Sequence, residues 1–298
     1  MKHNLLRHTI APLIAAFIWG TAFAAQSICA DYIEPFTFNA LRGLIASITL
    51  FIIYIVYSKA AKRLAPKSPI PWKKLIPGSL LCGLFLSIAS NMQQLGLGDT
   101  SAGKAGFITA LYIVIVPILG LFTGKKCGLK VWISVAVAVV GLYFLCITET
   151  FTIAPSDFYV FICAIVFGVH IMVIDKYTQS VEGILLSLGQ FIVVTVISGI
   201  GMLIFENPSI AGITECILPT LYVGIFSSGV AYTLQIIAMR GANPTKISLL
   251  LSLESVFAVV GGTFIGERLS GRELIGCVLM FGAVILSQLP SEKEREIK

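Results

Sequence analysis

The sequence predicts an all-α integral membrane protein with ten transmembrane helices, arranged as two inverted five-helix repeats. Composition, the spacing of apolar segments and an internal match predict this fold. Of the 298 residues, 57% are hydrophobic and only 12% are charged, whereas soluble globular domains carry about 25% charged residues. The net charge of +6 is spread over loops and does not form the basic groove of a nucleic-acid binder. We therefore expect a lipid bilayer as the surroundings and no nucleic-acid partner.

Ten apolar segments follow one another along the chain, with prolines such as Pro35, Pro155 and Pro244 in the separators. A helix of about 20 apolar residues crosses a hydrocarbon core of about 30 Å, and it satisfies its own backbone there. The first segment has features of a secretory signal, but it is long enough to span and belongs to the repeat described below. The expected helices cover residues 9–28, 36–57, 75–95, 102–122, 131–148, 157–174, 183–204, 214–236, 245–264 and 272–289.

The basic residues predict the orientation of these helices. If the N-terminus is cytoplasmic, most of the 21 lysines and arginines fall on that side, and only Arg268 and Arg272 fall on the other. Such an asymmetry follows the positive-inside rule. We expect a multi-pass protein of the plasma or inner cell membrane with both termini in the cytoplasm.

The two halves of the sequence match each other at rare residue types. Residues 1–152 and 153–298 would each hold five crossings, and an odd number forces the second repeat to run through the bilayer in the opposite sense. Transporters of this kind bind substrate near the midplane between the repeats. An offset of 142 residues aligns Pro77 with Pro219, Gln93 with Gln235, Lys104 with Lys246 and Gly120 with Gly262, and an offset of 148 aligns Gly20 with Gly168, Trp19 with Phe167 and Arg42 with Gln190.

Three segments carry a resemblance to a known family: Ile18-Trp19-Gly20-Thr21-Ala22-Phe23, Thr100-Ser101-Ala102-Gly103-Lys104-Ala105-Gly106-Phe107 and Gly266-Glu267-Arg268-Leu269. The sequence resembles the EamA-type family of the drug/metabolite transporter superfamily over nearly its whole length. The resemblance implies ten helices, cytoplasmic termini and a central cavity lined mainly by helices 1, 3, 4, 6, 8 and 9. It also implies transport of amino acids or other small metabolites, often outward.

Charged residues inside the apolar segments are the first candidates for substrate binding, because an ionisable side chain at bilayer depth usually faces protein or water. Glu254 lies deep in the ninth helix, and Lys246 lies on the same face about two turns earlier. They could hold the two charges of a zwitterion, and Glu254 could carry a coupling proton. Alternatively, Glu254 bonds a neighbouring helix and Lys246 reaches the interface. Tyr112 is the repeat partner of Glu254, and Lys104 is the repeat partner of Lys246. A lysine at the start of a helix favours an anionic partner or substrate, because that end of the helix dipole is positive.

Uncharged polar and aromatic residues complete the candidate substrate site. Amides and hydroxyls can bind polar solutes, but they also bond helices to one another. The repeat favours Gln93 and Gln235 for the cavity. Trp19 could stack on a substrate ring or simply fill space. The other candidates are Asn91 and Tyr232.

Three further features have a structural alternative. His170 is a second candidate for proton coupling, although a lone histidine is more often a packing residue. Arg42 is expected to pair with a carbonyl or an acid. Gly120-x-x-x-Gly124 is expected to be a packing seam between helices.

The sequence predicts a secondary transporter that exports a small polar metabolite, such as an amino acid, by alternating access. It has no phosphate-binding loop, no metal-binding signature and no nucleophile elbow, so no cofactor and no enzyme activity are expected. An intramembrane enzyme using Glu254 and His170, or a receptor without a transport cycle, is the alternative. A homodimer is possible.

Overall fold

The computed structural model describes residues 5–62, 69–100, 102–125, 127–147, 154–263 and 270–289. Within these ranges it contains helices and no strand. Among the described residues, eight helical segments are long and apolar enough to cross a membrane, and Leu129–Leu145 is a shorter apolar helix. Large apolar side chains such as Leu203, which is 77% exposed, cover the outside of the bundle, as expected for helices that face lipid. The all-helical membrane fold is confirmed, and the count of ten crossings stays a prediction.

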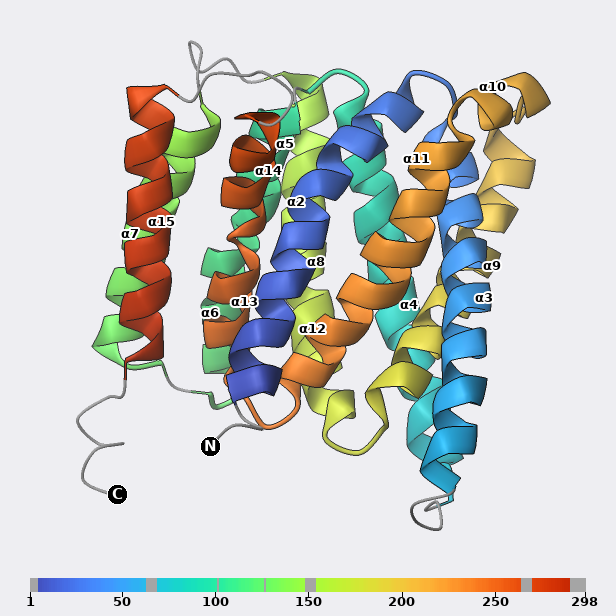
Figure 1. The fold of residues 1–298 in the computed structure, drawn as a ribbon, viewed down its shortest axis with the longest axis horizontal. Helices are drawn as coiled ribbons and strands as arrows, with labels where there is room; N and C mark the ends of the chain where they lie inside the picture. The colour runs from blue at the N-terminus through green and yellow to red at the C-terminus, as the bar shows by residue number, and fades with distance from the viewer. Residues whose placement is uncertain are drawn as a thin grey trace.

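The helices lie close to the expected ranges and form one bundle (Figure 1). The main difference is that three expected helices are divided into shorter pieces. In the first half, the elements are η1 (Leu6–Ile10), α2 (Ala11–Ala30), α3 (Pro35–Lys62), α4 (Trp72–Leu97), α5 (Ala102–Ala110), α6 (Tyr112–Phe122) and α7 (Leu129–Cys146). In the second half, they are α8 (Pro155–Thr178), α9 (Gly183–Phe205), α10 (Ile210–Glu215), α11 (Ile217–Tyr222), η2 (Val223–Ala231), α12 (Tyr232–Met239), α13 (Pro244–Leu251), α14 (Glu254–Thr263) and α15 (Gly271–Gln288).

Two of the expected helices are interrupted at matching positions. The helix expected at 102–122 breaks at Leu111, between α5 and α6, and the helix expected at 245–264 breaks at Ser252 and Leu253, between α13 and α14. Positions 111 and 253 correspond under the offset of 142 residues. At the second break the Ser252 hydroxyl donates to the Leu249 carbonyl at 2.9 Å, and such side-chain bonds compete with helical backbone bonds. Irregular backbone inside a membrane is tolerated where protein or a polar cavity surrounds it.

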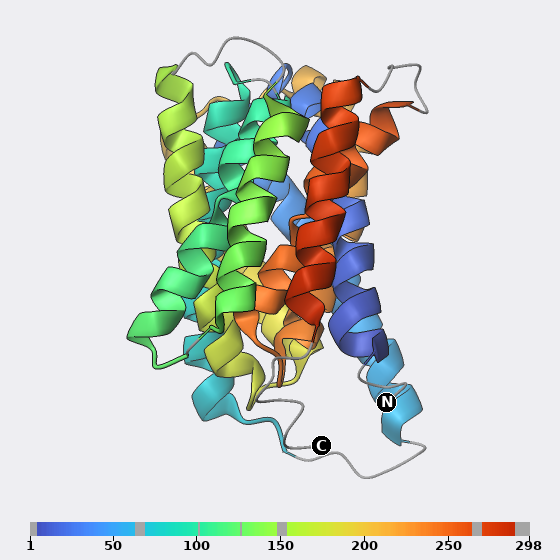
Figure 2. The same cartoon turned by 90° about the vertical axis from the view of Figure 1, so that its left-hand side faces the viewer.

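Helices at corresponding positions in the two halves of the chain make similar packing contacts. Helix α2 packs against α14, and α6 packs against α8; α3 packs against α9, and α7 packs against α15. Figure 1 and Figure 2 both show α7 and α15 side by side at one edge of the bundle. Helix α2 lies so close to α14 that a Cβ atom on Gly20 would lie 2.5 Å from the Glu254 carbonyl oxygen. At the position aligned with Gly20, a Cβ atom on Gly168 would lie 2.6 Å from Ile115.

The packing role expected for Gly120 and Gly124 is wrong. Gly124 has a φ of +76° just after α6, in the left-handed region that favours glycine. The Lys125 N–H donates to the Gly120 carbonyl at 2.8 Å, and the Gly124 N–H donates to the Leu121 carbonyl at 3.2 Å. This is the Schellman pattern of a helix C-terminus. Gly120 and Gly124 therefore form the C-terminal end of α6. Gly266, the repeat partner of Gly124, lies outside the described residues.

Candidate substrate cavity

A cavity inside the bundle brings together six of the predicted substrate-binding residues: Glu254, Tyr112, Gln93, Gln235, Trp19 and Tyr232. Its walls come from α2, α4, α5, α6, α8, η2, α12 and α14, with one residue from α3. These elements correspond to the six helices that the family resemblance implies, with α3 in addition. The remaining lining residues are Phe23, Gln26, Arg42, Thr109, Phe167, Ile171 and Ser227.

Glu254 and Tyr112 face each other across this cavity. The Tyr112 hydroxyl donates to Glu254 Oε1 at 3.4 Å, and the two residues are 5% and 4% exposed, respectively. Tyr112 is the first residue of α6 and Glu254 is the first residue of α14, so the breaks described above place both side chains.

The amide and aromatic candidates surround this pair. Gln93 donates from Nε2 to Thr109 Oγ1 at 3.2 Å, whereas the buried Oε1 of Gln235 accepts no hydrogen bond among the described residues. Trp19 donates from Nε1 to the Ser227 carbonyl at 3.2 Å. The Trp19 ring also packs edge-on against Tyr232, with 4.8 Å between the ring centroids. The cavity thus combines one carboxyl group, amides and aromatic faces.

Asn91 lies outside the cavity lining. Its Nδ2 donates to the Ser87 carbonyl at 2.8 Å and to Ser198 Oγ at 3.0 Å. Its Oδ1 accepts from Asn39 Nδ2 at 3.1 Å. These bonds join α3, α4 and α9, so Asn91 connects helices in this conformation.

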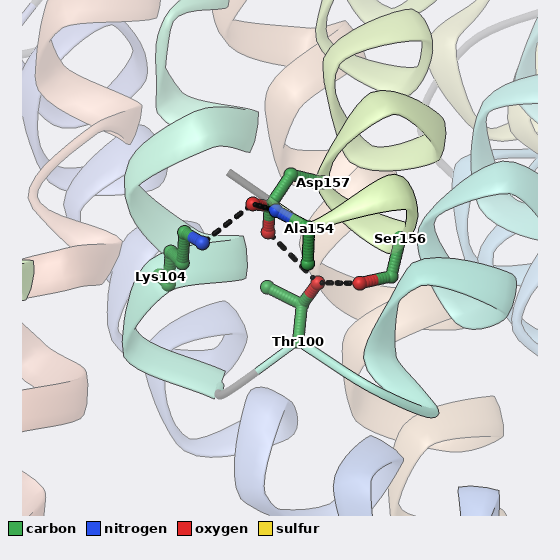
Figure 3. Close-up of polar contacts among 5 residues, drawn as sticks. All are labelled: Thr100, Lys104, Ala154, Ser156 and Asp157. Carbon is green, nitrogen blue, oxygen red and sulfur yellow. Dashed lines mark hydrogen bonds and ion pairs between the residues drawn. The ribbon is translucent and has the colours of Figure 1, made fainter. Parts of the chain in front are cut away.

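Lys104 also lies outside the cavity lining, and its anionic partner is Asp157. Lys104 Nζ lies 2.5 Å from Asp157 Oδ2, which also accepts from the Ala154 N–H at 2.7 Å. Thr100 Oγ1 lies 3.0 Å from Asp157 Oδ1 and 2.8 Å from Ser156 Oγ. Figure 3 shows this group, with Lys104 on α5 and the acid on the first turn of α8. The ion pair neutralises the lysine and ties α5 to α8.

Lys246 and His170 complete the predicted set, and neither is among the lining residues. Lys246 lies in α13, where its backbone carbonyl accepts from Gln288 Nε2 at 3.3 Å. His170 is 0% exposed, and its Nε2 lies 3.1 Å from Gln190 Oε1. Its ring centroid lies 6.2 Å from that of Tyr232. His170 is therefore one layer behind the cavity wall.

Sequence reasoning missed Gln26, Thr109 and Ser227 and gave Arg42 a structural role. The available signal was the presence of polar residues inside apolar segments, which is strongest for Arg42 and Gln26. Arg42 donates from Nε to Ser228 Oγ at 2.9 Å and from Nη1 to Gln26 Oε1 at 3.0 Å. The structure thus places a buried cation in the cavity wall, where the sequence had favoured Lys246.

Comparisons with known proteins agree with this architecture. The model of the EamA-like transporter family matches twice, at residues 8–147 and 154–289. An uncharacterized transporter of Archaeoglobus fulgidus is 28% identical, with 93% of this chain and 84% of that protein aligned. A WAT1-related chloroplastic protein of Arabidopsis thaliana is 24% identical, over 92% of this chain and 67% of that protein.

A solved crystal structure has the same fold, with a TM-score of 0.77 at 18% identity and 98% of both chains covered. The family matches together cover most of the sequence, and the relatives bear out the resemblance found in the sequence. The chain is a multi-pass membrane transporter protein that belongs to the EamA-like transporter family, within the drug/metabolite transporter superfamily.

Proposed function

We propose that this protein is a secondary transporter that exports a small polar metabolite, such as an amino acid, by alternating access. In this proposal, residues 1–152 and 153–298 are inverted repeats of five helices each. They would rock against each other around the central cavity, which would open in turn to either side of the membrane. Both termini would lie in the cytoplasm.

The contact between Tyr112 and Glu254 carries the proposal. The offset of 142 residues predicts that these positions are equivalent, and their side chains meet at 3.4 Å. Gln93 and Gln235, a second equivalent pair, line the same cavity, as do Trp19 and Phe167. Equivalent residues converge in this way when two repeats enclose one site. The separate family matches to the two halves of the chain support the same division.

The chemistry of the cavity supports a polar substrate. Glu254 could bind an ammonium group or carry a coupling proton, and the amides of Gln93 and Gln235 could hydrogen-bond a solute without a further charge. The unpartnered Oε1 of Gln235 offers an acceptor that a substrate N–H or O–H could use. A buried polar atom without a partner is costly, so a ligand in contact with it gains affinity. Of the two proton candidates, Glu254 lines the cavity and His170 does not, which favours Glu254.

Counterflow in proteoliposomes tests the proposal. Vesicles containing the purified protein are loaded with one solute of a metabolite panel, and uptake of the labelled solute is measured with and without a pH gradient. We expect saturable uptake that depends on the loaded solute. Absence of flux for the whole panel, or chemical conversion of a lipid-borne substrate, would contradict transport.

Glu254→Gln and a matched control locate the function in the cavity. Glu254→Gln should abolish flux or remove its dependence on pH without loss of folded protein. Glu206→Gln is the control, because Glu206 accepts hydrogen bonds from the N–H groups of Phe36 and Thr37 and does not line the cavity. Normal, pH-responsive flux in Glu254→Gln would remove the role proposed for this carboxyl group.

A further inference from the structure

Arg42 is the only positively charged side chain among the described residues that line the cavity. It lies in α3 and is 4% exposed. Lys104 is paired with Asp157 outside the lining, and Lys246 is not a lining residue either. Any anionic group that enters the cavity therefore meets Arg42 and neither lysine.

The hydrogen-bond partners of Arg42 are uncharged. Nε donates to Ser228 Oγ and Nη1 donates to Gln26 Oε1, and the guanidinium carbon lies 5.6 Å from the centroid of the Phe38 ring. The Tyr232 hydroxyl also interacts electrostatically with the guanidinium. In the described part of the chain, no carboxylate lies within ion-pair distance of Arg42. The positive charge is thus buried without a counter-ion.

A buried cation without a counter-ion is expensive, above all at membrane depth. An arginine has five N–H donors in a planar fork, and two of them bond Ser228 and Gln26 here. These two bonds fix the orientation of the guanidinium without cancelling its charge. A fork held in this way suits a planar anion, which it can bind through two parallel hydrogen bonds.

The cavity lining holds the guanidinium of Arg42 and the carboxyl group of Glu254 together with aromatic residues. Tyr232 lines the same cavity and interacts electrostatically with both Arg42 and Glu254. The rings of Trp19, Phe23 and Phe167 supply apolar wall in the same cavity. The residue aligned with Arg42 in the second repeat is Gln190, which is neutral, so the positive charge of the cavity comes from the first repeat.

We propose that Arg42 binds the carboxylate of the transported solute and so selects solutes that carry one. This inference rests on the proposed transport function and deepens it. The substrate would be a small carboxylate with an apolar or aromatic body, and an amino group would face Glu254. Gln26 and Ser228 act as positioning residues for the guanidinium.

Matched solutes test the inference on the unaltered protein. Binding is measured by thermal stabilisation, and transport by counterflow, for a panel of amino acids and for the corresponding amino-acid amides, which lack the carboxylate. L-Phenylalanine and L-phenylalaninamide are the first pair because the walls are aromatic. Loss of one charge-assisted contact should weaken binding of the amide about 10- to 100-fold.

Arg42 variants assign this selectivity to the side chain. In Arg42→Gln, the ratio of acid to amide affinity should fall to about one, and Arg42→Lys should keep part of the preference because charge remains but the fork is lost. Arg272→Gln is the control, since Arg272 stacks on Tyr143 at 5.1 Å and does not line the cavity. Its ratio should equal that of the unaltered protein.

The outcomes separate the two proposals. Transport of amides or other solutes without an anionic group as readily as of acids would overturn the role of Arg42 and leave transport intact. An unchanged acid-to-amide ratio in folded Arg42→Gln would also overturn it. Absence of flux for every solute would contradict the transport function itself. If Arg42→Gln does not fold, the ratio of acid to amide affinity, measured on the unaltered protein and on Arg42→Lys, tests the role of Arg42.

Discussion

The hydroxyl of Tyr112 lies 3.4 Å from a carboxylate oxygen of Glu254, although the two residues are 142 positions apart. The same offset aligns the two halves of the sequence, and each residue opens a helix that starts inside the bundle. Because α5–α6 and α13–α14 break at corresponding positions, each half brings one polar group to the centre. The helix breaks are therefore part of how the cavity is built.

A double-mutant cycle should show that Tyr112 and Glu254 act together. We expect Tyr112→Phe and Glu254→Gln each to weaken substrate binding, with a coupling energy of about 0.5 to 3 kcal/mol between them, as is usual for residues in contact. Equilibrium binding to the two single variants and the double variant measures it. Tyr54→Phe, at a tyrosine of α3 outside the cavity lining, is the control. Effects that simply add would show that the two side chains work independently.

Asn91 and Gln93 are two positions apart in α4 and should behave differently. Asn91→Ala removes a bond to Ser87 within α4 and two bonds to other helices, to Ser198 in α9 and Asn39 in α3. A bond between membrane helices is worth about 0.6 kcal/mol. Asn91→Ala should lower thermal stability and leave substrate affinity unchanged. Gln93→Ala removes a cavity amide whose Nε2 donates to Thr109 Oγ1, so it should lower affinity more than stability.

Thermal unfolding and substrate binding measured on both variants check this difference. Ser198→Ala serves as a control for Asn91→Ala, because it removes one of the same bonds from the other side. A loss of affinity in Asn91→Ala without loss of stability would return Asn91 to the substrate site, where the sequence had placed it.

The sequence was sufficient to predict the membrane fold and six of the thirteen described residues that line the cavity. Rare polar residues that align between the halves predicted Gln93, Gln235, Tyr112 and Glu254, all of which line the cavity. Lys104 and Lys246 were favoured by the same rule, yet they lie at the outer ends of α5 and α13, where charge can be neutralised without entering the cavity. Alignment of the two halves of the sequence shows which positions correspond, but it does not show how deep in the bundle each side chain lies.

Arg42 could not be placed from the sequence for a different reason. Its repeat partner Gln190 is neutral, so symmetry gave no support for a role in the cavity. The orientation of its side chain depends on Gln26 in α2 and Ser228 in η2, and such contacts between distant segments leave no local pattern.

The Schellman turn at Gly124 was missed because two glycines four residues apart fit either a packing seam or a helix end.

The ion pair between Lys104 and Asp157 should stabilise the fold without contacting substrate. Asp157→Asn weakens the bonds that its carboxylate accepts from Lys104 and from the Ala154 N–H. We expect a loss of about 1 to 3 kcal/mol in the free energy of unfolding, because the lysine and aspartate side chains are only 17% and 7% exposed. Lys104→Met should give a loss of similar size.

Thermal and denaturant unfolding in detergent measure these losses, and binding to the folded variants gives the substrate affinity. Lys176→Met, an exposed lysine of α8 that contacts the Tyr177 ring, should change neither quantity. If Lys104→Met keeps its stability but loses affinity for carboxylates, then Lys104, and not the ion pair, matters for the substrate.

Gly20 sets how closely α2 approaches the helix that carries Glu254, and Gly20→Ala should disturb both stability and transport. The added Cβ atom would lie 2.5 Å from the Glu254 carbonyl oxygen and 2.8 Å from the Ala258 backbone nitrogen. Backbone atoms cannot move aside as a flexible side chain can, so α2 and α14 must separate. Overpacking of this kind costs about 1 to 3 kcal/mol, and it displaces the first turn of α14, where Glu254 lies.

Gly199→Ala is the matched control for Gly20→Ala, because a Cβ atom on Gly199 in α9 would meet nothing within 4 Å. Alanine is the better helix former, so Gly199→Ala should keep or raise the thermal stability and leave flux unchanged. In Gly168→Ala the nearest atoms to the added Cβ would be side-chain atoms of Ile115 and Leu119, so the effect should be intermediate, since a side chain can yield. Equal melting temperatures and equal counterflow rates for all three variants would show that the contact between α2 and α14 tolerates a methyl group. The close approach of the two helices would then play no part in holding Glu254 against Tyr112.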